Sequence, residues 1–481
     1  MPPTPALPSG QGLSGRRHLP VPQASSLTSQ VTLSAASAHE PLSLTLQRQA
    51  SARIRASGIP GREALLDVAM AKRLTSAHAW YRAISAARTA TMAQELPVAA
   101  YNPRAARVLA SGDAHLYQPT AARHSKQSLM LSIGDSDRIG LGPYEWDVRS
   151  QLISIELEGR VRGFTSAKRQ AAMTAFLEAY RRGINQVANA SDAEAAAGAL
   201  RLFVGDAPPM VLKFLAASLT LSRNDWLDER VQKQGDNAEF KTKPQSLEHL
   251  PNKPKGAAAR IRKALAKAAS RYADALYGDA RDRLKNYKLV DVAMPYKGNG
   301  SLGYGRYYAL LVPGKGLKHL EDAVILEFKE QLPCDLSLYV DASDTEAKFG
   351  RHQGERAVAL MRLGSGAHAV PSWSHTELPA GCGVVSSHFT IKEVDPTERG
   401  FDPSMLNAQD FQSWARINGQ LMAAFQTLAG TKAPTLLGGA CDIAEDMANK
   451  PNFDADNLNA AVRKADDYER EFKILKASAG Q

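Results

Sequence analysis

The segment from Ser111 to Gln118 carries side chains that could take part in acid–base chemistry. It reads Ser-Gly-Asp-Ala-His-Leu-Tyr-Gln and so brings a carboxylate, an imidazole and an amide close together in the sequence. A carboxylate held in a loop can orient a hydroxyl group and accept its proton, which makes Asp113 a candidate general base. His115 is expected to support the loop by packing or hydrogen bonding. Because Gly-Asp is also a common turn pair, the alternative for this segment alone is a surface turn.

A second acidic segment follows a β-prone run at 129–133. It contains Asp135 and Asp137, separated by a serine. Carboxylate oxygens are ligands that Mg²⁺ prefers, so we expect Asp135 to be a metal ligand and Asp137 to be a second one. Asp147 resembles the buried aspartate that braces the catalytic loop of kinase-like phosphotransferases through its backbone. The alternative is that these carboxylates merely cap turns.

A glycine-rich stretch lies between two predicted strands, Leu289–Met294 and Tyr307–Val312. It reads Gly-Asn-Gly-Ser-Leu-Gly, and its glycines would let the backbone approach a phosphate and present N–H groups to it. A dinucleotide-binding fingerprint would stand between a strand and a helix. The glycine loop of protein kinases stands between two strands and covers the phosphates, and this sequence resembles the second case. The alternative is a glycine-rich hairpin turn. The positions expected at the nucleotide are Gly298, Gly300, Ser301 and Gly303.

Lys329 ends a β-prone run that starts at Ala323. Alternation along a strand places Lys329 on the same face as Ile325 and Glu327, and Val324 on the opposite face. The spacing after the glycine-rich stretch is typical of the third strand of a kinase small lobe, where a lysine contacts the α- and β-phosphates of ATP. On its own, an exposed lysine at a strand end would explain this residue equally well.

The four segments together indicate a kinase-like site for ATP and Mg²⁺, but Asp113 and Asp135 precede the glycine-rich stretch instead of following it. A circular permutation accounts for this order, because such a site depends on two lobes facing each other and new termini are tolerated at a surface. The predicted fold class is α+β. We expect a two-lobed protein-kinase-like fold, circularly permuted, with a small antiparallel β-sheet lobe and a larger helical lobe.

The predicted organisation along the chain has five parts. The parts are a disordered leader (1–60), the catalytic part of the helical lobe (61–220), a polar loop and basic helix (221–287), a β-rich nucleotide-binding lobe (288–396), and C-terminal helices that complete the helical lobe (397–475). Residues 228–258 are polar and predict a loop. Residues 166–193 predict helices, with Ser166 as a plausible N-cap.

These motifs resemble, in type and order, those of a bacterial family called domain of unknown function 2252. Members carry Gly-Asp-x-His, Asp-Phe-Asp, Gly-Pro-x-x-Trp-Asp and Gly-x-Gly-Ser-x-Gly stretches, and later Lys-Glu. The likeness spans about residues 60 to 475. Weaker similarities are Trp80–Ala83, which looks like an upstream aromatic-Arg-Gly motif, and Lys392–Pro396. The matching positions of this chain are Gly112–His115, Asp135–Asp137, Gly142–Asp147, Gly300–Gly303 and Lys329–Glu330.

The sequence departs from the family pattern at positions that bear on metal binding. Gln118 stands where the family has an asparagine; a glutamine can also ligate Mg²⁺, but its side chain is one methylene longer. Ser136 replaces the phenylalanine between the two acids. A kinase-like site also needs a carboxylate to pair with Lys329, and Glu355, at the start of a predicted helix, is the candidate. These departures leave open a weak kinase or a pseudokinase.

Composition narrows the class of partner. The net charge is +10, but the basic residues are scattered, which favours solubility over a nucleic-acid partner. The three cysteines are far apart and form no disulfide framework or zinc motif, so we expect a reducing, cytoplasmic compartment. No apolar run approaches the roughly 20 residues that span a bilayer, so we expect no membrane partner.

Residues 1–60 are rich in Pro, Ser, Gln and Ala, and Glu40 is their only acid. Such a composition predicts disorder, with no secretory signal peptide. It is also similar to the leaders of type III secreted effectors, so export from the cell is an alternative location.

The sequence thus supports several functions. The leading hypothesis is an ATP- and Mg²⁺-dependent phosphotransferase acting on a small-molecule or protein hydroxyl, with nucleotidyl transfer as a variant. The alternatives are a nucleotide-binding pseudokinase or scaffold, a secreted effector, and a nucleic-acid-binding protein, of which the last rests on net charge alone.

Overall fold

The structure, a computed structural model, describes most of the chain from residue 64 onward. The described residues are 64–125, 128–134, 137–243, 246–250, 256–272, 282–297, 299, 304–341, 352–364, 373–380 and 385–479, with short pieces at 41–52, 274 and 343. Nearly all of the predicted leader lies outside these residues. The same holds for five predicted site positions, which are Asp135, Gly298, Gly300, Ser301 and Gly303.

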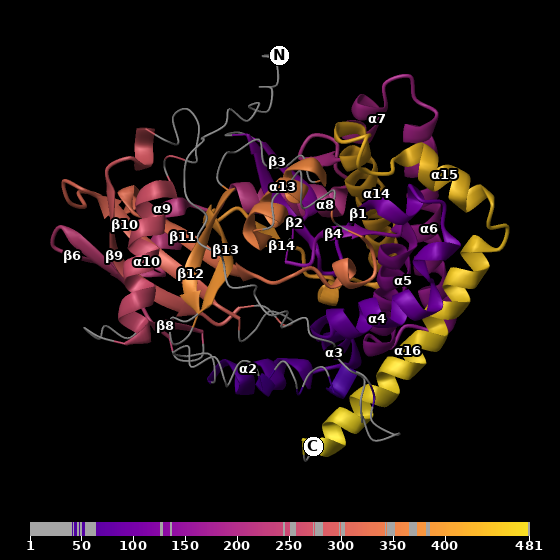
Figure 1. Cartoon of the computed structure of the whole chain (residues 1–481), viewed down its shortest axis with the longest axis horizontal. Helices are drawn as coiled ribbons and strands as arrows, with labels where there is room; N and C mark the ends of the chain where they lie inside the picture. Colours follow the sequence, from indigo (N-terminus) through magenta and orange to yellow (C-terminus); the bar gives the residue numbers. More distant parts are fainter. Residues whose placement is uncertain are drawn as a thin grey trace, which may run out of the picture.

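The described chain is a mixed α+β protein with antiparallel sheets, arranged as a β-rich part and a helical part that lie side by side (Figure 1). The β-rich part is built on a six-stranded sheet with the order β12-β13-β11-β10-β9-β8. Its strands are β8 (Leu247–His249), β9 (Tyr287–Pro295), β10 (Arg306–Pro313), β11 (Val324–Gln331), β12 (Trp373–Ala380) and β13 (Val385–Glu393). Helix α13 (Gln353–Gly364) follows β11 in the chain and contacts β11, β12 and β13.

The two faces of this sheet are covered by different elements. On one face, Leu326 and Phe328 of β11 pack with Ile261 of α10 (Ala257–Tyr272). On the other face, Ile325 packs with apolar residues of α9 (Arg223–Asp228) and of a hairpin made by β6 (Val231–Gln234) and β7 (Asn237–Phe240). The side-chain alternation of a strand continues that second face to Glu327 and Lys329, toward the helical part.

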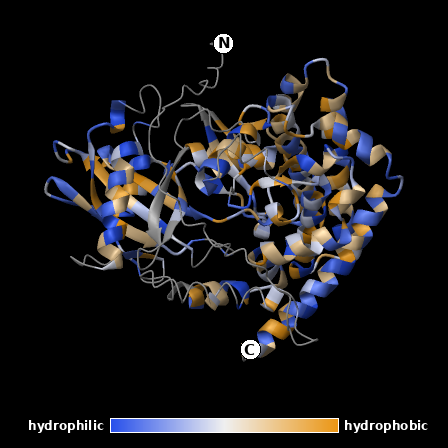
Figure 2. Ribbon diagram, viewed as in Figure 1, coloured by the Kyte–Doolittle hydropathy of each residue, from blue (hydrophilic) through white to orange (hydrophobic). Residues whose placement is uncertain are grey.

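The helical part has one large apolar core. Its helices are α2 (Ala64–Arg73), α3 (Ala77–Ala83), α4 (Ser85–Glu95), α5 (Tyr144–Val161), α6 (Ser166–Ala188), α7 (Ala193–Ala199), α8 (Pro209–Leu219), α14 (Ala408–Lys432), α15 (Ala440–Ala448) and α16 (Phe453–Ser478). Helices α6 and α14 pack against each other along much of their length. Figure 2 shows hydrophobic residues gathered where the helices meet and hydrophilic residues on outer surfaces. Within the described residues, no helix combines the length and apolarity needed to cross a membrane.

Short strands inside the helical part bring its functional loops together. Strands β1 (Val108–Ala110) and β4 (Gly140–Gly142) pair, and a second sheet has the order β14-β2-β3-β5. The strands of that sheet are β14 (Arg399–Gly400), β2 (Pro119–Ser125), β3 (Ser128–Ile133) and β5 (Leu202–Phe203). The loop after β1 and the loop before β4 therefore lie at one place, facing β11.

Several local predictions need correction. The polar stretch 228–258 is not a plain loop, because it contains β6, β7 and β8, and β8 joins the large sheet. The N-cap of α6 is Thr165 and not Ser166, since the Thr165 hydroxyl accepts a hydrogen bond from the Lys168 backbone N–H. Strand β12 and helices α5 and α15 were not predicted. Most of the other predicted runs correspond to observed elements with slightly different ends.

The packing of α6 against α14 leaves no room for a side chain at Gly419. A methyl group there would lie 2.2 Å from the Phe176 carbonyl oxygen, which belongs to the α6 backbone. We therefore expect Gly419→Ala to lower the free energy of unfolding by about 1–3 kcal/mol, despite the better helix propensity of alanine. Chemical denaturation followed by circular dichroism measures this. The matched control is Gly198→Ala in α7, where the nearest atom would be 3.5 Å away; equal effects of the two changes would contradict the packing argument.

Candidate active site

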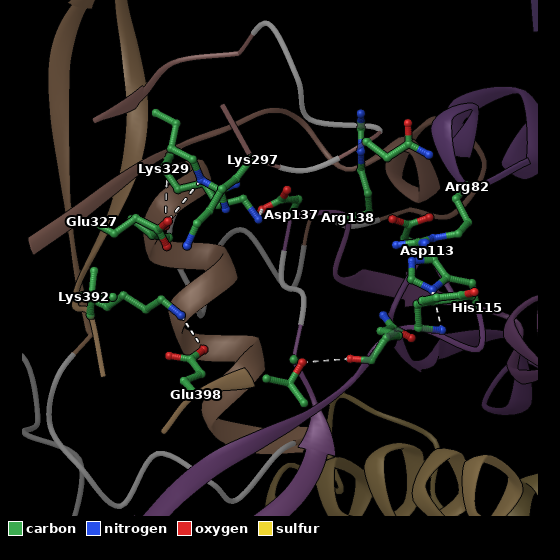
Figure 3. Close-up of a pocket in the computed structure, with 18 of the residues that line it drawn as sticks. Arg82, Asp113, His115, Asp137, Arg138, Lys297, Glu327, Lys329, Lys392 and Glu398 are labelled. Atoms are coloured by element: carbon green, nitrogen blue, oxygen red, sulfur yellow. Dashed lines mark hydrogen bonds and ion pairs between the residues drawn. The ribbon is translucent and has the colours of Figure 1, made fainter. Parts of the chain in front are cut away.

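A cavity of about 280 Å³ lies between the β-rich part and the helical part (Figure 3). Its lining is rich in charge: six of the described lining residues are cationic and five are acidic. The cations are Arg82, Arg138, Lys297, Arg306, Lys329 and Lys392, and the acids are Asp113, Asp137, Glu327, Asp395 and Glu398. In Figure 3, Asp113 and His115 lie at one end of this set, Lys392 and Glu398 lie at the other, and Asp137 lies between them.

Asp147 of α5 braces the loop that carries Asp113, as the sequence predicted. The Asp147 carboxylate accepts hydrogen bonds from the backbone N–H groups of Ser111, at 2.6 Å, and Gly112, at 3.2 Å. Complete burial raises the pKa of Asp147 to about 6, although these hydrogen bonds favour its ionised form. Gly112 has a φ of +66°, and a side chain there would lie 2.3 Å from the Arg138 carbonyl oxygen. The loop therefore requires glycine at this position.

Asp113 itself forms an ion pair with Arg88 of α4. The Arg88 side chain is almost completely buried and also donates a hydrogen bond to the Ala114 carbonyl, at 3.3 Å. Its guanidinium lies over the Tyr81 ring, with 4.5 Å between the guanidinium carbon and the ring centroid. Arg88 thus fixes the orientation of the Asp113 carboxylate, and sequence reasoning did not single it out.

His115 and Gln118 complete the helical side of the cavity. The His115 Nδ1 atom accepts a hydrogen bond from the Tyr117 backbone N–H, at 3.1 Å, so the imidazole stabilises the loop as expected. Gln118 is 2% exposed, and neither polar atom of its amide has a hydrogen-bond partner among the described residues. A buried amide without partners is costly unless a ligand or water satisfies it. This side chain is the clearest sign that the cavity receives a polar ligand.

Lys329 reaches across the cavity from β11. Its ammonium lies 2.5 Å from an oxygen of Asp137, and both side chains are about 15% exposed. Asp137 belongs to the loop that follows β3, so the ion pair joins the β-rich part to the helical part. The Gln331 amide lies 3.4 Å from the same carboxylate. Two residues predicted from separate motifs are therefore in direct contact.

Glu355, the predicted partner of Lys329, does not line the cavity. It lies in the first turn of α13, and its backbone N–H donates to His352 Nδ1 at 3.2 Å. The next residue, Arg356, is buried and donates to the Leu332 carbonyl at 3.2 Å. Among the described residues, Asp137 provides a carboxylate that contacts Lys329.

A charged network beyond Lys329 was missed in the sequence. Glu327 pairs with Arg306 at 3.1 Å, and Lys392 pairs with Glu398. Burial raises the pKa of Glu327, but the nearby cations, of which Arg306 and Lys392 have the largest effect, lower it overall to about 2. Burial also lowers the pKa of Lys297. The sequence could have indicated Glu327 as part of this network, since strand alternation places it on the same face as Lys329.

Of the glycine-rich segment 298–303, the structure describes Asn299. The Asn299 amide donates to the Ala79 carbonyl at 2.5 Å, and Arg73 donates to the Asn299 carbonyl at 3.2 Å. Helices α2 and α3 of the helical part therefore contact this segment. Asp135 and the four predicted glycine-loop positions lie outside the described residues, and the described residues contain no cluster of three or more His, Cys, Asp or Glu side chains placed to hold a metal.

Comparison with known proteins covers almost the whole of the described chain. Residues 62–478 match a family described as "Uncharacterized protein conserved in bacteria (DUF2252)". The chain belongs to the DUF2252 family. No curated protein and no solved structure matches it. The match includes every described residue of the cavity, so Lys329, Asp137 and Asp113 lie within the family region of this DUF2252 protein.

The low pKa of Glu327 gives a prediction for this DUF2252 protein. Because the pKa in the folded state lies below its ordinary value of 4.5, ionised Glu327 stabilises the fold above pH 4.5, and this contribution is lost as the pH falls toward 2. We expect Glu327→Gln to lower the free energy of unfolding by about 3 kcal/mol at pH 7 and by progressively less below pH 4.5.

Urea denaturation of both proteins between pH 7 and pH 3 measures this difference. The control is Glu178→Gln on the exposed face of α6, which should change the free energy of unfolding by less than about 0.5 kcal/mol at every pH. A difference between Glu327→Gln and the wild type that does not vary with pH would contradict the assignment of the charge network.

Proposed function

We propose that this protein is an ATP- and Mg²⁺-dependent phosphotransferase that acts on a hydroxyl group of a small molecule or a protein, with a kinase-like, circularly permuted arrangement of two lobes. The observation that carries the proposal is the contact between Lys329 and Asp137 across a cavity that Asp113 also lines. A cation for phosphate, a carboxylate for metal and a carboxylate for the acceptor are the groups that phosphoryl transfer needs in one place.

The order of elements in the β-rich part supports this proposal. Strands β9, β10 and β11 are consecutive neighbours in the sheet, and the glycine-rich stretch connects β9 to β10. Lys329 lies on β11, the third of these strands, and α13 follows it. In protein kinases a glycine-rich loop and a lysine on the third strand hold the phosphates, and a helix comes next. Here the Asp113 loop and the strands around it come earlier in the chain, as a circular permutation would require.

Several described residues of the cavity would bind a nucleotide's phosphates, and Gln118 and Asp137 would offer oxygen atoms to a magnesium ion. Lys297 and Lys329 would hold phosphate oxygens, since both line the cavity and face its centre in Figure 3. The Gln118 amide, which has no hydrogen-bond partner among the described residues, would bind a metal ion or a metal-bound water in the cavity that Asp137 also lines. The other predicted ligand, Asp135, lies outside the described residues. When bound, Mg²⁺ would neutralise part of the phosphate charge.

Residues of the helical part would position and deprotonate the acceptor hydroxyl. Asp113 would accept a hydrogen bond from the acceptor hydroxyl and take its proton as the oxygen bonds to the γ-phosphorus of ATP. The bond between that phosphorus and the β,γ-bridging oxygen would break, so that ADP leaves. Arg88 fixes the orientation of the Asp113 carboxylate through their ion pair. Asp147 holds the loop by accepting hydrogen bonds from the N–H groups of Ser111 and Gly112.

A nucleotide-binding pseudokinase is the second candidate function. The ion pair between Arg88 and Asp113 favours it, because a carboxylate engaged by a buried guanidinium is a weaker base. In that case the protein would bind ATP through the same cavity and use it as a structural ligand.

The substitution Asp113→Ala separates these functions. We expect it to reduce phosphoryl transfer from labelled ATP to an acceptor panel by about 10²–10⁴-fold, because it removes the general base. The dissociation constant of Mg-ATP, measured by calorimetry, should change less than about threefold, because Lys329 and not Asp113 holds the phosphates.

The matched control is Asp206→Ala, which removes an exposed carboxylate of the helical part away from the cavity. Full activity of Asp113→Ala would contradict the mechanism. Mg-ATP binding by the wild type without transfer to any acceptor would favour the pseudokinase, and absence of binding would reject both functions.

A further inference from the structure

A second, larger cavity adjoins the first. It has a volume of about 650 Å³. The residues that line both cavities are Lys297, Tyr308, Val394, Asp395 and Glu398. Both cavities therefore lie against the same face of the sheet and the same connecting segment, which leads from β13 back to the helical part.

The second cavity is built by the segment that the sequence had predicted as a polar loop. Helix α9 and the β6–β7 hairpin pack on the sheet through Leu227 and Phe240, which contact the apolar cluster around Ile325. Trp226 of α9 is half-buried and lines the cavity. The Arg230 guanidinium lies 4.8 Å from the centroid of the Trp226 ring and holds one face of the indole. The other apolar lining residues are Leu221, Phe240, Leu247, Pro295, Ile325, Val394 and Pro396.

Strand β11 runs along both cavities and sets their order. Ile325 lines the second cavity, whereas Glu327 and Lys329 line the first. Alternate residues of a strand share a face, so the four residue-to-residue steps from Ile325 to Lys329 place the two ends about 14 Å apart. That separation is within the length of an extended nucleoside triphosphate. Asp113 lies at the opposite end of the first cavity, as Figure 3 shows.

We propose that the second cavity binds the base and the ribose of the nucleotide, with Trp226 packing against the base. This inference rests on the proposed function, which places the phosphates at Lys329. The first cavity alone, at about 280 Å³, falls just below the roughly 300–1,000 Å³ range of pockets that enclose small organic ligands. A ligand whose phosphates bind at Lys329 must therefore extend beyond the first cavity. The adjoining second cavity has aromatic and aliphatic lining residues that suit a planar base.

The acceptor does not suit this second cavity. The acceptor's hydroxyl has to reach Asp113, which does not line the second cavity. Lys297 and Lys329 lie between Asp113 and the second cavity. The segment that contains α9 and the β6–β7 hairpin is thus an element for nucleotide recognition and not a lid over the acceptor.

Calorimetry with two ligands tests this assignment on the full chain. We expect Trp226→Ala to weaken Mg-ATP binding about tenfold or more, the range of a lost base–aromatic contact. Binding of magnesium tripolyphosphate, which has no base, should stay within about twofold of the wild type. Trp226→Phe should keep most of the Mg-ATP affinity because it retains an aromatic ring. The control Asn224→Ala changes a residue of the same helix that contacts Glu321 outside the cavity, and it should leave both affinities unchanged.

The outcomes separate this inference from the proposed function. If Trp226→Ala binds Mg-ATP as the wild type does while Lys329→Ala loses it, the second cavity is not the base site and the phosphotransferase proposal stands. If Trp226→Ala weakens both ligands equally, the effect is on the fold and the inference is overturned. If the wild type binds neither ligand, both proposals fail.

Discussion

The ion pair between Lys329 and Asp137 is the contact on which the rest of the site depends. Charges that are largely withdrawn from water are tolerated only when each has a partner, and here the partners come from different parts of the fold. The pair therefore fixes β11 relative to the loop after β3. A phosphate bound at Lys329 would compete with Asp137 for the ammonium group, and the Mg²⁺ proposed for this site would offset the negative charge of both.

The helical part supports the site in a different way, through buried contacts to the backbone. Asp147 holds two consecutive N–H groups of the Asp113 loop, and Gly112 lets the chain turn there against the Arg138 carbonyl. Arg88 then fixes the carboxylate. The helical side is preorganised, whereas the β-rich side contributes charges that are balanced by one another. Such a division suits a site in which the acceptor is positioned firmly and the anionic ligand exchanges.

The sequence predicted the parts of the site that local patterns determine. Strand alternation placed Lys329 correctly, and the resemblance to kinase-like motifs identified Asp147 as the brace of the Asp113 loop. The β6–β7 hairpin was also predictable, because Gly235 and Asp236 form a two-residue turn of a kind typical of hairpins, and Gly235 has a φ of +59°. It was misread because few of its residues are apolar. The Arg88–Asp113 and Lys329–Asp137 pairs could not be predicted, since each depends on how distant elements pack.

Chemical labelling of the lysines tests the central claim most directly. An acyl-phosphate derivative of ATP acylates lysines that lie beside the bound phosphates, and mass spectrometry of the peptides identifies them. The account predicts that Lys329 is the main labelled residue, with Lys297 next, and that excess Mg-ATP suppresses both. Labelling spread over exposed lysines, or left unchanged by excess Mg-ATP, would contradict a nucleotide site between the β-rich part and the helical part.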